Sequence, residues 1–551
     1  MGILEGMCKM GLYLNAKKPA TLYKAERSRP YFVDKTLLLD ELFPLVEAGN
    51  QFVCITRPRR FGKTVMANMV ASFFGKSECA SVFEGLQIQS RAEQCARHEN
   101  QHNVIYISFY EKPSSCKSYE DYIGRVQRIL FEDIRRAYPA CRIDQNSEIW
   151  DILSLLYEEE EARFIFVFDE WDYIFHQEFV TQADKREYLS FLGNLLKDKP
   201  YVELAYMTGI LPIAKYASGS ELNMFREYTM STQHKYSDYF GFTESEVDML
   251  YGRYAQNTAE RRVTREGLCE WYDGYHTPKG ERLYNPRSVV LALENNQLAD
   301  YWTSSGPYDE IFTYVKENVA DVRDAIAVMM AGEAVETNVK QYAATATELR
   351  TRDQIFSAMV VYGFLTCEKG RVSIPNRELM DKFADMVLEE QAMGYMYRLA
   401  KESERMLMAT KAGDTAAMEA ILTQAHDTET GMAGYNDETE LSAIVRLVYL
   451  AAREYYDVQR EDKAGVGYVD YIFYPTVDKT ADCIILELKI DHTPEEAIEQ
   501  IKDRKYAQRF IGKLGEQLPY RGRILAVGIA YSKKDRHKKH RCKVEVLRER
   551  I

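Results

Sequence analysis

The chain has 551 residues and a net charge of −13, from 71 Lys and Arg residues against 84 Asp and Glu residues. Its 46% hydrophobic content is enough to bury several cores, which excludes a disordered chain, and the length favours about three or four domains. The acidic balance excludes binding to nucleic acid by bulk charge alone, so such binding would need a local basic surface.

The ten cysteines are scattered, and none forms a Cys-x-x-Cys pair. His98 and His102 have zinc-like spacing near Cys95, but a second cysteine is missing nearby. Neither a disulfide scaffold nor a structural zinc site is expected, and reduced thiols favour a cytoplasmic protein. We expect no secretory signal and no membrane partner, because nothing reaches the roughly 18 apolar residues of a membrane span.

Short apolar runs in the first part of the chain are typical of buried strands, and helical patterns separate them. The expected strands are 51–55, 103–109, 163–168 and 203–207. The expected helices include 63–74, 118–138 and 185–196. Strands that alternate with helices predict a parallel sheet flanked by helices, an α/β fold, over about residues 20–214.

The pattern is mostly helical from about residue 240 to about residue 440, and it then changes again. The last part has expected helices at 441–456 and 494–506 and expected strands at 468–474, 483–489 and 523–531. This mixture predicts a small mixed α/β module at the C-terminal end.

A phosphate-binding loop is predicted over residues 57–64, between an expected strand and an expected helix. The motif is G-x-x-x-x-G-K-[ST]; Gly62, Lys63 and Thr64 match it, and Arg57 replaces the first Gly. In such a loop the backbone N–H groups face the phosphates at a helix N-terminus. Lys63 would reach the β- and γ-phosphates, and the Thr64 hydroxyl would hold Mg²⁺.

The rest of this loop carries further charge. Pro58 can fix the loop in place of the missing Gly, and the three arginines add positive charge beside a polyphosphate. We therefore expect the nucleotide to contact Arg57, Pro58, Arg59, Arg60, Phe61, Gly62, Lys63 and Thr64. The simpler alternative is a Gly-Lys-Thr that only begins a helix.

The expected strand at 163–168 ends in two carboxylates, Asp169 and Glu170. A buried strand would deliver Asp169 to its tip, where it can support Mg²⁺ beside Thr64. Glu170 points to a different side and could polarise the attacking water. A solvated strand end with two acids is the alternative for each residue.

Two further polar residues lie near predicted element ends. Thr208 follows the expected strand at 203–207 and could contact the γ-phosphate or a water, although a Thr-Gly turn is an equally good interpretation. Asp34 precedes a helical run that reaches Phe43, and an N-cap is the simpler role for it than a nucleotide contact.

The C-terminal module presents a possible second phosphate site. Glu487 and Lys489 are two residues apart on one expected strand, so their side chains share a face, and Asp470 begins the neighbouring strand. The two acids could hold Mg²⁺, or Mn²⁺, for phosphodiester hydrolysis, while Lys489 would orient the water or stabilise developing charge. Gln500 on the following helix could support them. An amphipathic edge strand with a surface Glu–Lys pair is the alternative.

The run Lys533–Lys543 is the most basic stretch of the chain. Its two interpretations are a phosphate-backbone contact near the second site and a solvated loop between strands.

In these residues the chain resembles bacterial AAA-ATPase-like proteins that end in a PD-(D/E)xK nuclease-like domain. The N-terminal resemblance rests on the segments Tyr31–Thr36, Arg57–Thr64, Phe168–Asp172, Thr208–Leu211, Tyr239–Thr243, Trp271–Tyr275 and Tyr284–Pro286. The C-terminal resemblance rests on Glu461, Gly465, Gly467, Asp470, Glu487, Lys489 and Gln500. Residues from about 300 to 430 match only loosely.

For the first site, the resemblance implies ATP bound by Gly62, Lys63 and Thr64, with Asp169 and Glu170 as the acidic pair.

For the second site, the resemblance implies a nuclease triad of Asp470, Glu487 and Lys489, supported by Gln500. Glu438 lies near the position at which related nuclease domains have an additional acid on the metal side. Two positions depart from the family pattern. Tyr468 stands where Arg is usual, and a His is often found near Ser442.

We therefore predict a P-loop ATPase domain over residues 1–235, a helical region over 236–435 and a restriction-endonuclease-like domain over 436–551. The expected function is an ATPase coupled to a metal-dependent hydrolase of nucleic acid, with DNA favoured over RNA. The alternative is a nucleotide-driven switch whose inactive nuclease-like module binds DNA or a protein partner. The sequence does not indicate an oligomeric state.

Overall fold

The chain forms two compact units in the computed structural model. One unit comprises Met1–Ser304, Val339–Glu348 and Ser357–Lys369, and the other comprises Ser305–Asn338, Leu349–Phe356 and Gly370–Ile551. The structure describes residues 11–76, 82–141, 147–213, 221–230, 235–302, 309–317, 319, 322–339, 349–427, 438–463, 468–476, 478, 480–507, 510, 520–533 and 539–550. The helical region expected over 236–435 contributes to both units, and the three-part division of the chain stays a prediction.

The first unit is built on a five-stranded parallel sheet with the strand order β2-β3-β4-β1-β5. Its strands are β1 (Gln51–Thr56), β2 (Asn103–Ser108), β3 (Phe164–Asp169), β4 (Val202–Gly209) and β5 (Arg226–Thr229). The four strands expected from apolar runs are confirmed within two residues at their ends. β5 was not expected, because its sequence REYT is short and has no apolar run.

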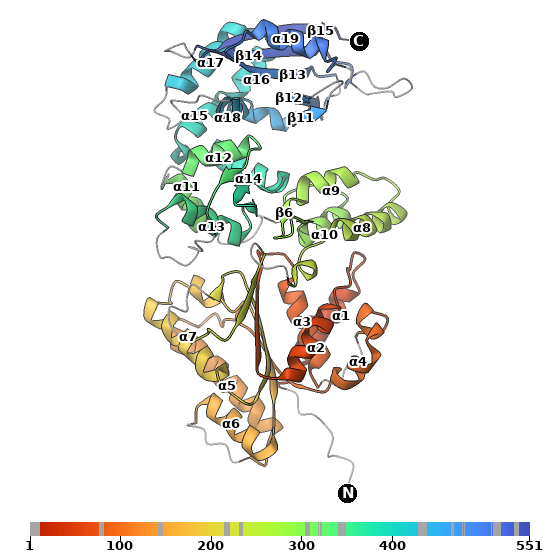
Figure 1. Cartoon of the computed structure of the whole chain (residues 1–551), viewed down its shortest axis with the longest axis vertical. Coiled ribbons are helices and arrows are strands. Elements are labelled where there is room, and N and C mark those ends of the chain that lie inside the picture. The colour runs from red at the N-terminus through yellow and green to blue at the C-terminus, as the bar shows by residue number, and fades with distance from the viewer. Residues whose placement is uncertain are drawn as a thin grey trace. The chain divides into compact units, whose positions relative to one another are not determined.

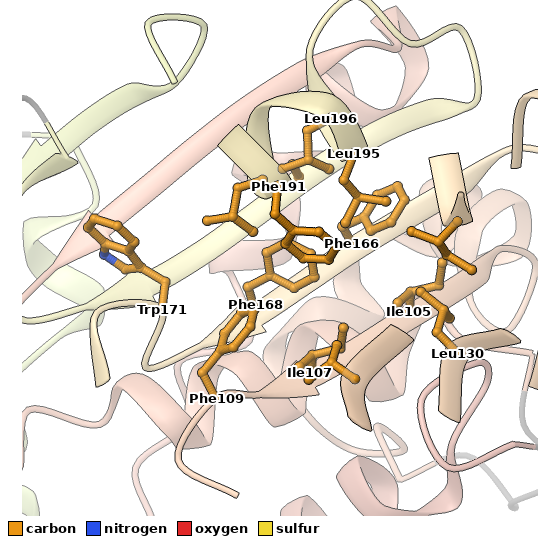
Figure 2. Packing of buried hydrophobic residues seen from close by; sticks show 14 of the residues in the cluster. Ile105, Ile107, Phe109, Leu130, Phe166, Phe168, Trp171, Phe191, Leu195 and Leu196 are labelled. Carbon is orange, nitrogen blue, oxygen red and sulfur yellow. The ribbon is translucent and has the colours of Figure 1, made fainter. Parts of the chain in front are cut away.

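Helices cover both faces of this sheet (Figure 1). One face carries α1 (Lys17–Arg27), α2 (Leu38–Ala48), α3 (Lys63–Phe74) and α4 (Ala92–His98), and the other carries α5 (Tyr119–Ala137), α6 (Ile149–Glu160) and α7 (Gln182–Leu196). Successive residues of β3 alternate between the two hydrophobic cores, because strand side chains point to opposite faces. Figure 2 shows one of these cores, in which Phe166 and Phe168 lie near Phe191 and Leu195 of α7.

The strand order determines which side chains can meet at the carboxyl edge of the sheet. β4 lies between β1, which leads into the phosphate loop, and β3, which ends in Asp169. Thr208 near the end of β4 is therefore the residue that stands between the loop and the acidic strand end. The order could not be obtained from the sequence pattern, because apolar runs identify strands without identifying their neighbours.

A small helical subdomain follows the sheet in the first unit. It contains α8 (Glu244–Asn257), α9 (Arg265–Tyr272), the short hairpin of β6 (Tyr275–His276) and β7 (Arg282–Leu283), and α10 (Pro286–Asn295). Its hydrophobic core includes Tyr31 and Val33 from the segment before α2. The segments Trp271–Tyr275 and Tyr284–Pro286, which carried part of the resemblance, lie in this subdomain.

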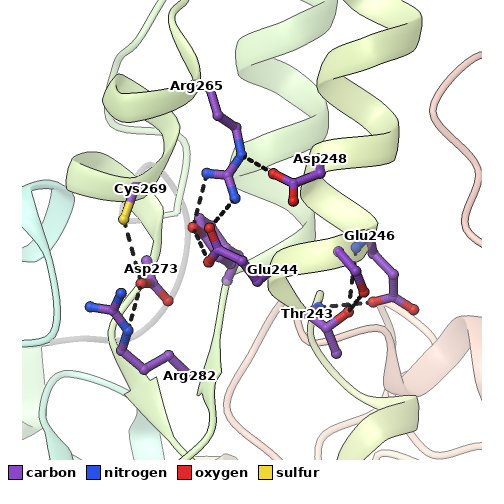
Figure 3. Close-up of polar contacts among 10 residues, drawn as sticks. Thr243, Glu244, Glu246, Asp248, Arg265, Cys269, Asp273 and Arg282 are labelled. Atoms are coloured by element: carbon purple, nitrogen blue, oxygen red, sulfur yellow. Dashed lines mark hydrogen bonds and ion pairs between the residues drawn. The ribbon is translucent and has the colours of Figure 1, made fainter.

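Polar contacts hold the turns of this subdomain in place (Figure 3). Arg265 of α9 contacts Asp248 at 2.6 Å and also pairs with Glu244 of α8. Asp273, just after α9, accepts from the Cys269 thiol and pairs with Arg282 at 3.1 Å. These bonds fix the turn after α9, and so they fix the strand that begins at Tyr275.

The second unit contains a five-stranded mixed sheet in the order β11-β12-β13-β14-β15. Its strands are β11 (Tyr456–Lys463), β12 (Tyr468–Pro475), β13 (Cys483–Ile490), β14 (Ile524–Tyr531) and β15 (Arg541–Arg548). Only β13 and β14 are parallel, and α19 (Pro494–Asp503) connects them. A Cβ at Gly528 of β14 would lie 2.4 Å from the Pro494 carbonyl oxygen, so glycine lets α19 approach this strand closely.

Helices complete the second unit. They include α11 (Asp309–Lys316), α12 (Val322–Met330), α14 (Arg377–Glu389), α15 (Tyr395–Lys401), α16 (Ser403–Ala412), α17 (Thr415–Asp427) and α18 (Glu438–Val448). The expected helix over 441–456 ends earlier, because α18 stops at Val448 and β11 begins at Tyr456. β11 and β15 were not expected, since both are polar edge strands without an apolar run.

The predicted fold class is confirmed: a parallel sheet flanked by helices on both faces, helical segments in the middle, and a C-terminal mixed α/β module. Across the described ranges, every helix is too short or too polar to cross a lipid bilayer.

Candidate functional site

The phosphate loop runs from the end of β1 to the first residue of α3. Gly62 has a φ of 85°, a left-handed conformation that glycine adopts without strain, and a Cβ there would meet no atom within 4 Å. Backbone conformation rather than crowding therefore requires the glycine. The Met66 N–H donates to the Gly62 carbonyl at 3.0 Å, so the helix begins directly at the loop. The free N–H groups and dipole of this helix end favour an anion.

The Lys63 side chain is folded back over the loop. Its Nζ donates to the carbonyl oxygens of Arg57 at 2.9 Å and Pro58 at 2.8 Å. Burial lowers the pKa of the Lys63 ammonium to about 8, and the acids at positions 169, 170 and 172 oppose that shift. A buried ammonium held by two neutral carbonyls is a strong attractor for an incoming phosphate.

The acidic strand end lies beside this lysine. Asp169 is buried, and its Oδ1 accepts from the Thr208 hydroxyl at 2.6 Å. Burial raises the pKa of Asp169, while hydrogen bonds from Thr208 and Thr64 and the charge of Lys63 lower it. The structure thus brings Lys63, Thr64, Asp169 and Thr208 together from three strand ends. It makes Thr208 a contact of the acid rather than only a turn residue.

Glu170 adopts a φ of 52°, a conformation that side-chain-bearing residues rarely take. Burial raises the pKa of Glu170, the neighbouring Asp169 raises it further, and Lys63 lowers it. Glu170 is therefore electrostatically coupled to both Asp169 and Lys63, as expected for an acid that takes a proton beside an acid that supports an ion.

The turns after β3 and β4 are locked to each other. The Trp171 N–H donates to the Thr208 carbonyl at 3.0 Å, and Asp172 Oδ2 accepts from the N–H groups of Ile210 at 3.0 Å and Leu211 at 2.8 Å. A Cβ at Gly209 would lie 2.4 Å from the Trp171 ring, so the turn needs glycine. Asp172 was not predicted as a functional residue; its only sequence signal was its place in the segment that ends the acidic strand.

Arg57, expected to contact the nucleotide, has its side chain inside the protein. Its Nη1 donates to the carbonyl oxygens of Thr56 and Tyr228, both at 2.8 Å, and its guanidinium carbon lies 5.1 Å from the centre of the Phe240 ring. The hydrogen bond to Tyr228 and the stacking on Phe240 therefore direct this arginine toward β5.

The outer side of the loop is covered by aromatic residues. The Phe61 ring packs edge-on against Tyr275 with ring centres 4.9 Å apart, and the Trp302 indole N–H donates to the Arg59 carbonyl at 3.1 Å. A Cβ at Gly363 would lie 2.7 Å from the Pro58 Cβ. Side chains from the helical subdomain and from Ser357–Lys369 thus hold the loop in one conformation.

Arg60 in this loop has a φ of 69°, so the loop contains two left-handed residues. The side chains of Arg59 and Arg60 are half-buried, and both remain candidates for a phosphate contact.

Asp34 does not cap a helix as expected. α2 begins at Leu38, and its N-terminus has no side-chain cap. Asp34 Oδ1 instead accepts from the N–H of Thr36 at 2.9 Å, and its Oδ2 accepts from the N–H of Gln87 at 2.7 Å. The carboxylate therefore ties two loops together, a tertiary role that local helix signals do not reveal.

In the second unit, β12, β13 and α19 bring four of the predicted residues together. Glu487 Oε1 accepts from Lys489 Nζ at 3.1 Å and from the Gln500 amide. Asp470 Oδ2 accepts from the Leu488 N–H at 2.7 Å, so this acid lies across the strand pair beside Glu487. The two acids converge because β12 and β13 are antiparallel neighbours.

Glu487 is the most perturbed acid of this second site. Its side chain is 3% exposed, and its Oε2 is buried without a hydrogen-bond partner. Burial and, to a smaller extent, the neighbouring Asp470 raise the pKa of Glu487 to about 7, while Lys489 opposes the shift. A buried carboxylate oxygen without a donor, beside a second carboxylate, is suited to a cation.

Both sites present oxygen-bearing side chains to a divalent cation. Within the described residues there is no group of three or more His, Cys, Asp or Glu side chains that could hold an ion. Each site offers two oxygen-bearing side chains, Thr64 with Asp169 and Asp470 with Glu487. This fits Mg²⁺, which is commonly held by one or two carboxylates together with substrate phosphates and waters.

Some predicted residues cannot be placed. Gly465 and Gly467 lie outside the described residues, as do residues 534–538 of the basic run. For Glu438, Glu461 and Tyr468 only the backbone is described. Ser442, where related domains often have a His, hydrogen bonds to the hydroxyl of Tyr471 within the core of α18 and β12.

Comparison with known proteins identifies the two modules. Residues 23–217 match the family described as Predicted AAA-ATPase, and residues 437–541 match the PD-(D/E)XK nuclease superfamily. A similar curated relative is an uncharacterized protein in the vnfD 5′ region of Azotobacter chroococcum mcd 1. It is 24% identical over 507 residues, covering 87% of this chain and 90% of that protein.

Similar solved structures include the Walker-type ATPase PABY2304 of Pyrococcus abyssi, with 12% identity and a TM-score of 0.38 over 63% of this chain and 93% of that one. The ORC2 protein of Aeropyrum pernix matches with 11% identity and a TM-score of 0.30, covering 68% of this chain and 94% of that one. On the family matches, the chain carries a predicted AAA-ATPase domain at residues 23–217 and a domain of the PD-(D/E)XK nuclease superfamily at residues 437–541.

Proposed function

We propose that the chain hydrolyses ATP in the first unit and that its nucleotide state controls a metal-dependent phosphodiester hydrolase, acting on DNA, in the second. The observation that carries the first part is the convergence of Lys63, Thr64, Asp169 and Thr208 at adjacent strand ends. Family matches over both modules support the pairing of an ATPase with a nuclease.

In the ATPase site, the N–H groups of the loop and the ammonium of Lys63 would bind the β- and γ-phosphates. Thr64 and Asp169 would hold Mg²⁺, which when bound neutralises charge on the phosphates. Glu170 would accept the proton of the attacking water, and burial, which raises the pKa of Glu170, makes its carboxylate a stronger base. Thr208 would keep Asp169 oriented through its 2.6 Å hydrogen bond.

This part is tested by phosphate release from ATP. Lys63→Ala should abolish nucleotide binding, whereas Glu170→Gln should retain binding and lose hydrolysis by about 10²-fold or more, the range for removal of a general base. Lys24→Ala, at an exposed position of α1, is the matched control. ATP hydrolysis at the wild-type rate in both site variants would disprove the assignment.

In the nuclease-like site, Asp470 and Glu487 would hold the divalent cation, which when bound polarises the scissile phosphate. Lys489 would orient the water, and Gln500 would keep the Glu487 carboxylate in place through its hydrogen bond. Glu487→Gln and Lys489→Ala should each abolish Mg²⁺-dependent or Mn²⁺-dependent cleavage. Glu499→Gln, an exposed acid on the same helix as Gln500, should cleave normally.

The link between the two activities is supported by the surroundings of the phosphate loop. Gly363 packs on Pro58 of the loop and directly follows helix α13 (Arg352–Tyr362). The first part of α13 belongs to the second unit, and the part after Phe356 belongs to the first unit. A loop movement on nucleotide binding would therefore act on a segment whose helix continues into the second unit.

This coupling predicts that Lys63→Ala changes the cleavage rate or the DNA affinity of the full chain. Unchanged values would contradict the coupling while leaving both chemical assignments intact. Nucleotide-dependent DNA binding without any cleavage would instead support a nucleotide-driven switch with an inactive nuclease-like module.

A further inference from the structure

Arg57 is the residue of the phosphate loop that departs from the usual motif, because it takes the place of the first glycine. Its side chain is 1% exposed, which is rare for an arginine. Its backbone N–H donates to the Gly209 carbonyl at 3.1 Å, and its carbonyl accepts from Lys63 Nζ. The residue is therefore anchored to β4 and to the phosphate-binding lysine at the same time.

The groups around the guanidinium do not match its charge. Nη1 is satisfied by the carbonyl oxygens of Thr56 and Tyr228, and the Phe240 ring covers one face. Nε and Nη2 are buried without a hydrogen-bond partner, and no carboxylate in the described part of the chain forms an ion pair with Arg57. Carbonyls and a ring supply partial negative charge only, so a full positive charge remains inside the protein.

Lys63 provides the contrast within the same loop, because the acids at 169, 170 and 172 act on its ammonium. For Arg57, burial lowers the pKa to about 10, and the guanidinium therefore stays charged at neutral pH. An unpaired buried charge destabilises a fold, and a neutral side chain of similar length could make the same carbonyl bonds. The hydrogen bonds of Arg57 therefore do not explain why a charged side chain occupies this position.

A second small ligand does not account for this charge. The cavity that Arg57 borders, between the ends of β1, β4 and β5, has a volume of about 30 Å³. That is room for about two water molecules and too little for an organic anion. Arg57 belongs to the loop proposed to bind a polyphosphate, and its carbonyl accepts from Lys63 Nζ at 2.9 Å, so that polyphosphate is the anion that we consider.

We propose that Arg57 is a positioning residue with an electrostatic role: its buried guanidinium lacks a protein counter-ion and is compensated by the phosphates of the bound nucleotide. The inference rests on the proposed nucleotide binding. It assigns to Arg57 no direct contact with the phosphates, because the side chain is directed toward Tyr228 and Phe240. It makes affinity depend on ligand charge, since each added phosphate charge interacts with a guanidinium that water does not screen.

The test compares binding of AMP, ADP and ATP to the full chain by calorimetry, without divalent ions and at fixed ionic strength. Arg57→Gln and Arg57→Met remove the charge, and Arg57→Lys keeps it. We expect the neutral variants to lose affinity progressively, by on the order of three- to tenfold more for each added phosphate, while Arg57→Lys loses less. We also expect the nucleotide-free Arg57→Gln variant, which keeps an N–H donor, to melt at or above the wild-type temperature, because a buried unpaired charge has been removed.

The outcomes separate this inference from the proposed function. An equal loss of affinity for the three nucleotides would mean that Arg57 acts only as a structural strut, and it would overturn the inference, as would unchanged affinities. If Arg57→Met and Arg57→Gln do not fold, Arg57→Gly, which restores the usual residue of the motif, is the neutral variant, and the same progressive loss is expected of it. Absence of nucleotide binding by the wild-type chain would refute the proposed function itself.

Discussion

The hydrogen bond from Thr208 to Asp169 is the contact that connects β4 to the acidic strand end. From the sequence, a turn role and a phosphate or water contact were equally good interpretations of Thr208. The strand order explains its contact with Asp169, because β4 lies between β1 and β3. A buried carboxylate that loses its donor is left with an unmet acceptor, which costs about 1–3 kcal/mol.

Thr208→Val keeps the shape of the side chain and removes this donor. We expect unfolding free energy to fall by about 1–3 kcal/mol and ATP turnover to fall about tenfold or more, with ATP affinity changed much less. Thermal unfolding, the turnover number and the KM for ATP measure the three effects. A turnover number equal to that of the wild type would show that catalysis does not depend on the orientation that Thr208 gives to Asp169.

Glu487 provides a prediction for pH dependence in the second unit. Its pKa in the folded protein is raised to about 7, above the ordinary Glu value, so the protonated form is the one that the fold favours. Its contribution to stability is therefore fully present below about pH 4 and is lost as the pH rises through about 7. A shift of this size corresponds to a few kcal/mol at most.

Glu487→Gln should remove the loss of stability that ionisation of Glu487 causes. We therefore expect the variant to be more stable than the wild type above pH 8 in the absence of metal ions. Mg²⁺ should raise the melting temperature of the wild type above pH 7 and have little effect at pH 5, because the ionised carboxylate is the ligand. Chemical unfolding over pH 5 to 9, with EDTA or Mg²⁺, measures both. If the unfolding free energies of the wild type and the variant depend on pH in the same way, the raised pKa of Glu487 would be contradicted.

At the scale of elements, the sequence predicts most of the strands that carry the sites, because buried strands are apolar runs and α3 has regular helical spacing. Site residues at strand ends, such as Asp169 and Glu487, follow from those strands. The direction of the Arg57 side chain does not follow, since it depends on Tyr228 and Phe240, which are far away in the chain. The polar edge strands were missed for the same reason: their pairing partners, not their own apolar pattern, make them strands.

A second element-scale feature joins α2, α4 and β4 at the other end of the sheet. His98 Nδ1 lies 3.0 Å from His102 Nε2, His98 Nε2 lies 3.4 Å from Glu47, and His102 Nδ1 lies 2.8 Å from Glu203. The ring centres are 5.3 Å apart and the rings are nearly coplanar at 14°, so the facing nitrogens share one hydrogen bond. This geometry fits a proton between the rings, and it leaves no room for a zinc ion there.

The contacts of His98 predict that the stability of the protein falls at acid pH. Burial lowers the pKa of His98, His102 and Arg97 lower it too, and Glu47 opposes them. Because the lowered pKa disfavours the cation, the stability from His98 is present above the ordinary His value of about 6.5 and is lost as the pH falls. His98→Gln should therefore weaken the loss of stability between about pH 7 and pH 5, as followed by thermal unfolding. An unchanged slope would contradict the assignment.

At the scale of the whole molecule, the two proposed phosphate sites belong to different units, and the residues proposed for each site lie within one unit. The first depends on strand ends of the parallel sheet, and the second depends on β12, β13 and α19. The chain passes between the units after residues 304, 338, 348, 356 and 369. A chain so interlaced cannot transmit a change through a single linker, so we expect isolated units made by cutting at one point to fold poorly.

The central claim is that one chain holds two separate sites for phosphate chemistry. The most direct measurement incubates the full chain with labelled double-stranded DNA, Mg²⁺ and ATP, and follows phosphate release and DNA fragments together in the wild type, Lys63→Ala and Glu487→Gln. We expect Lys63→Ala to lose phosphate release, Glu487→Gln to lose fragments while still releasing phosphate, and the wild type to show both. Neither product from the wild type, or loss of both activities from the control variants Lys24→Ala and Glu499→Gln alone, would contradict this claim.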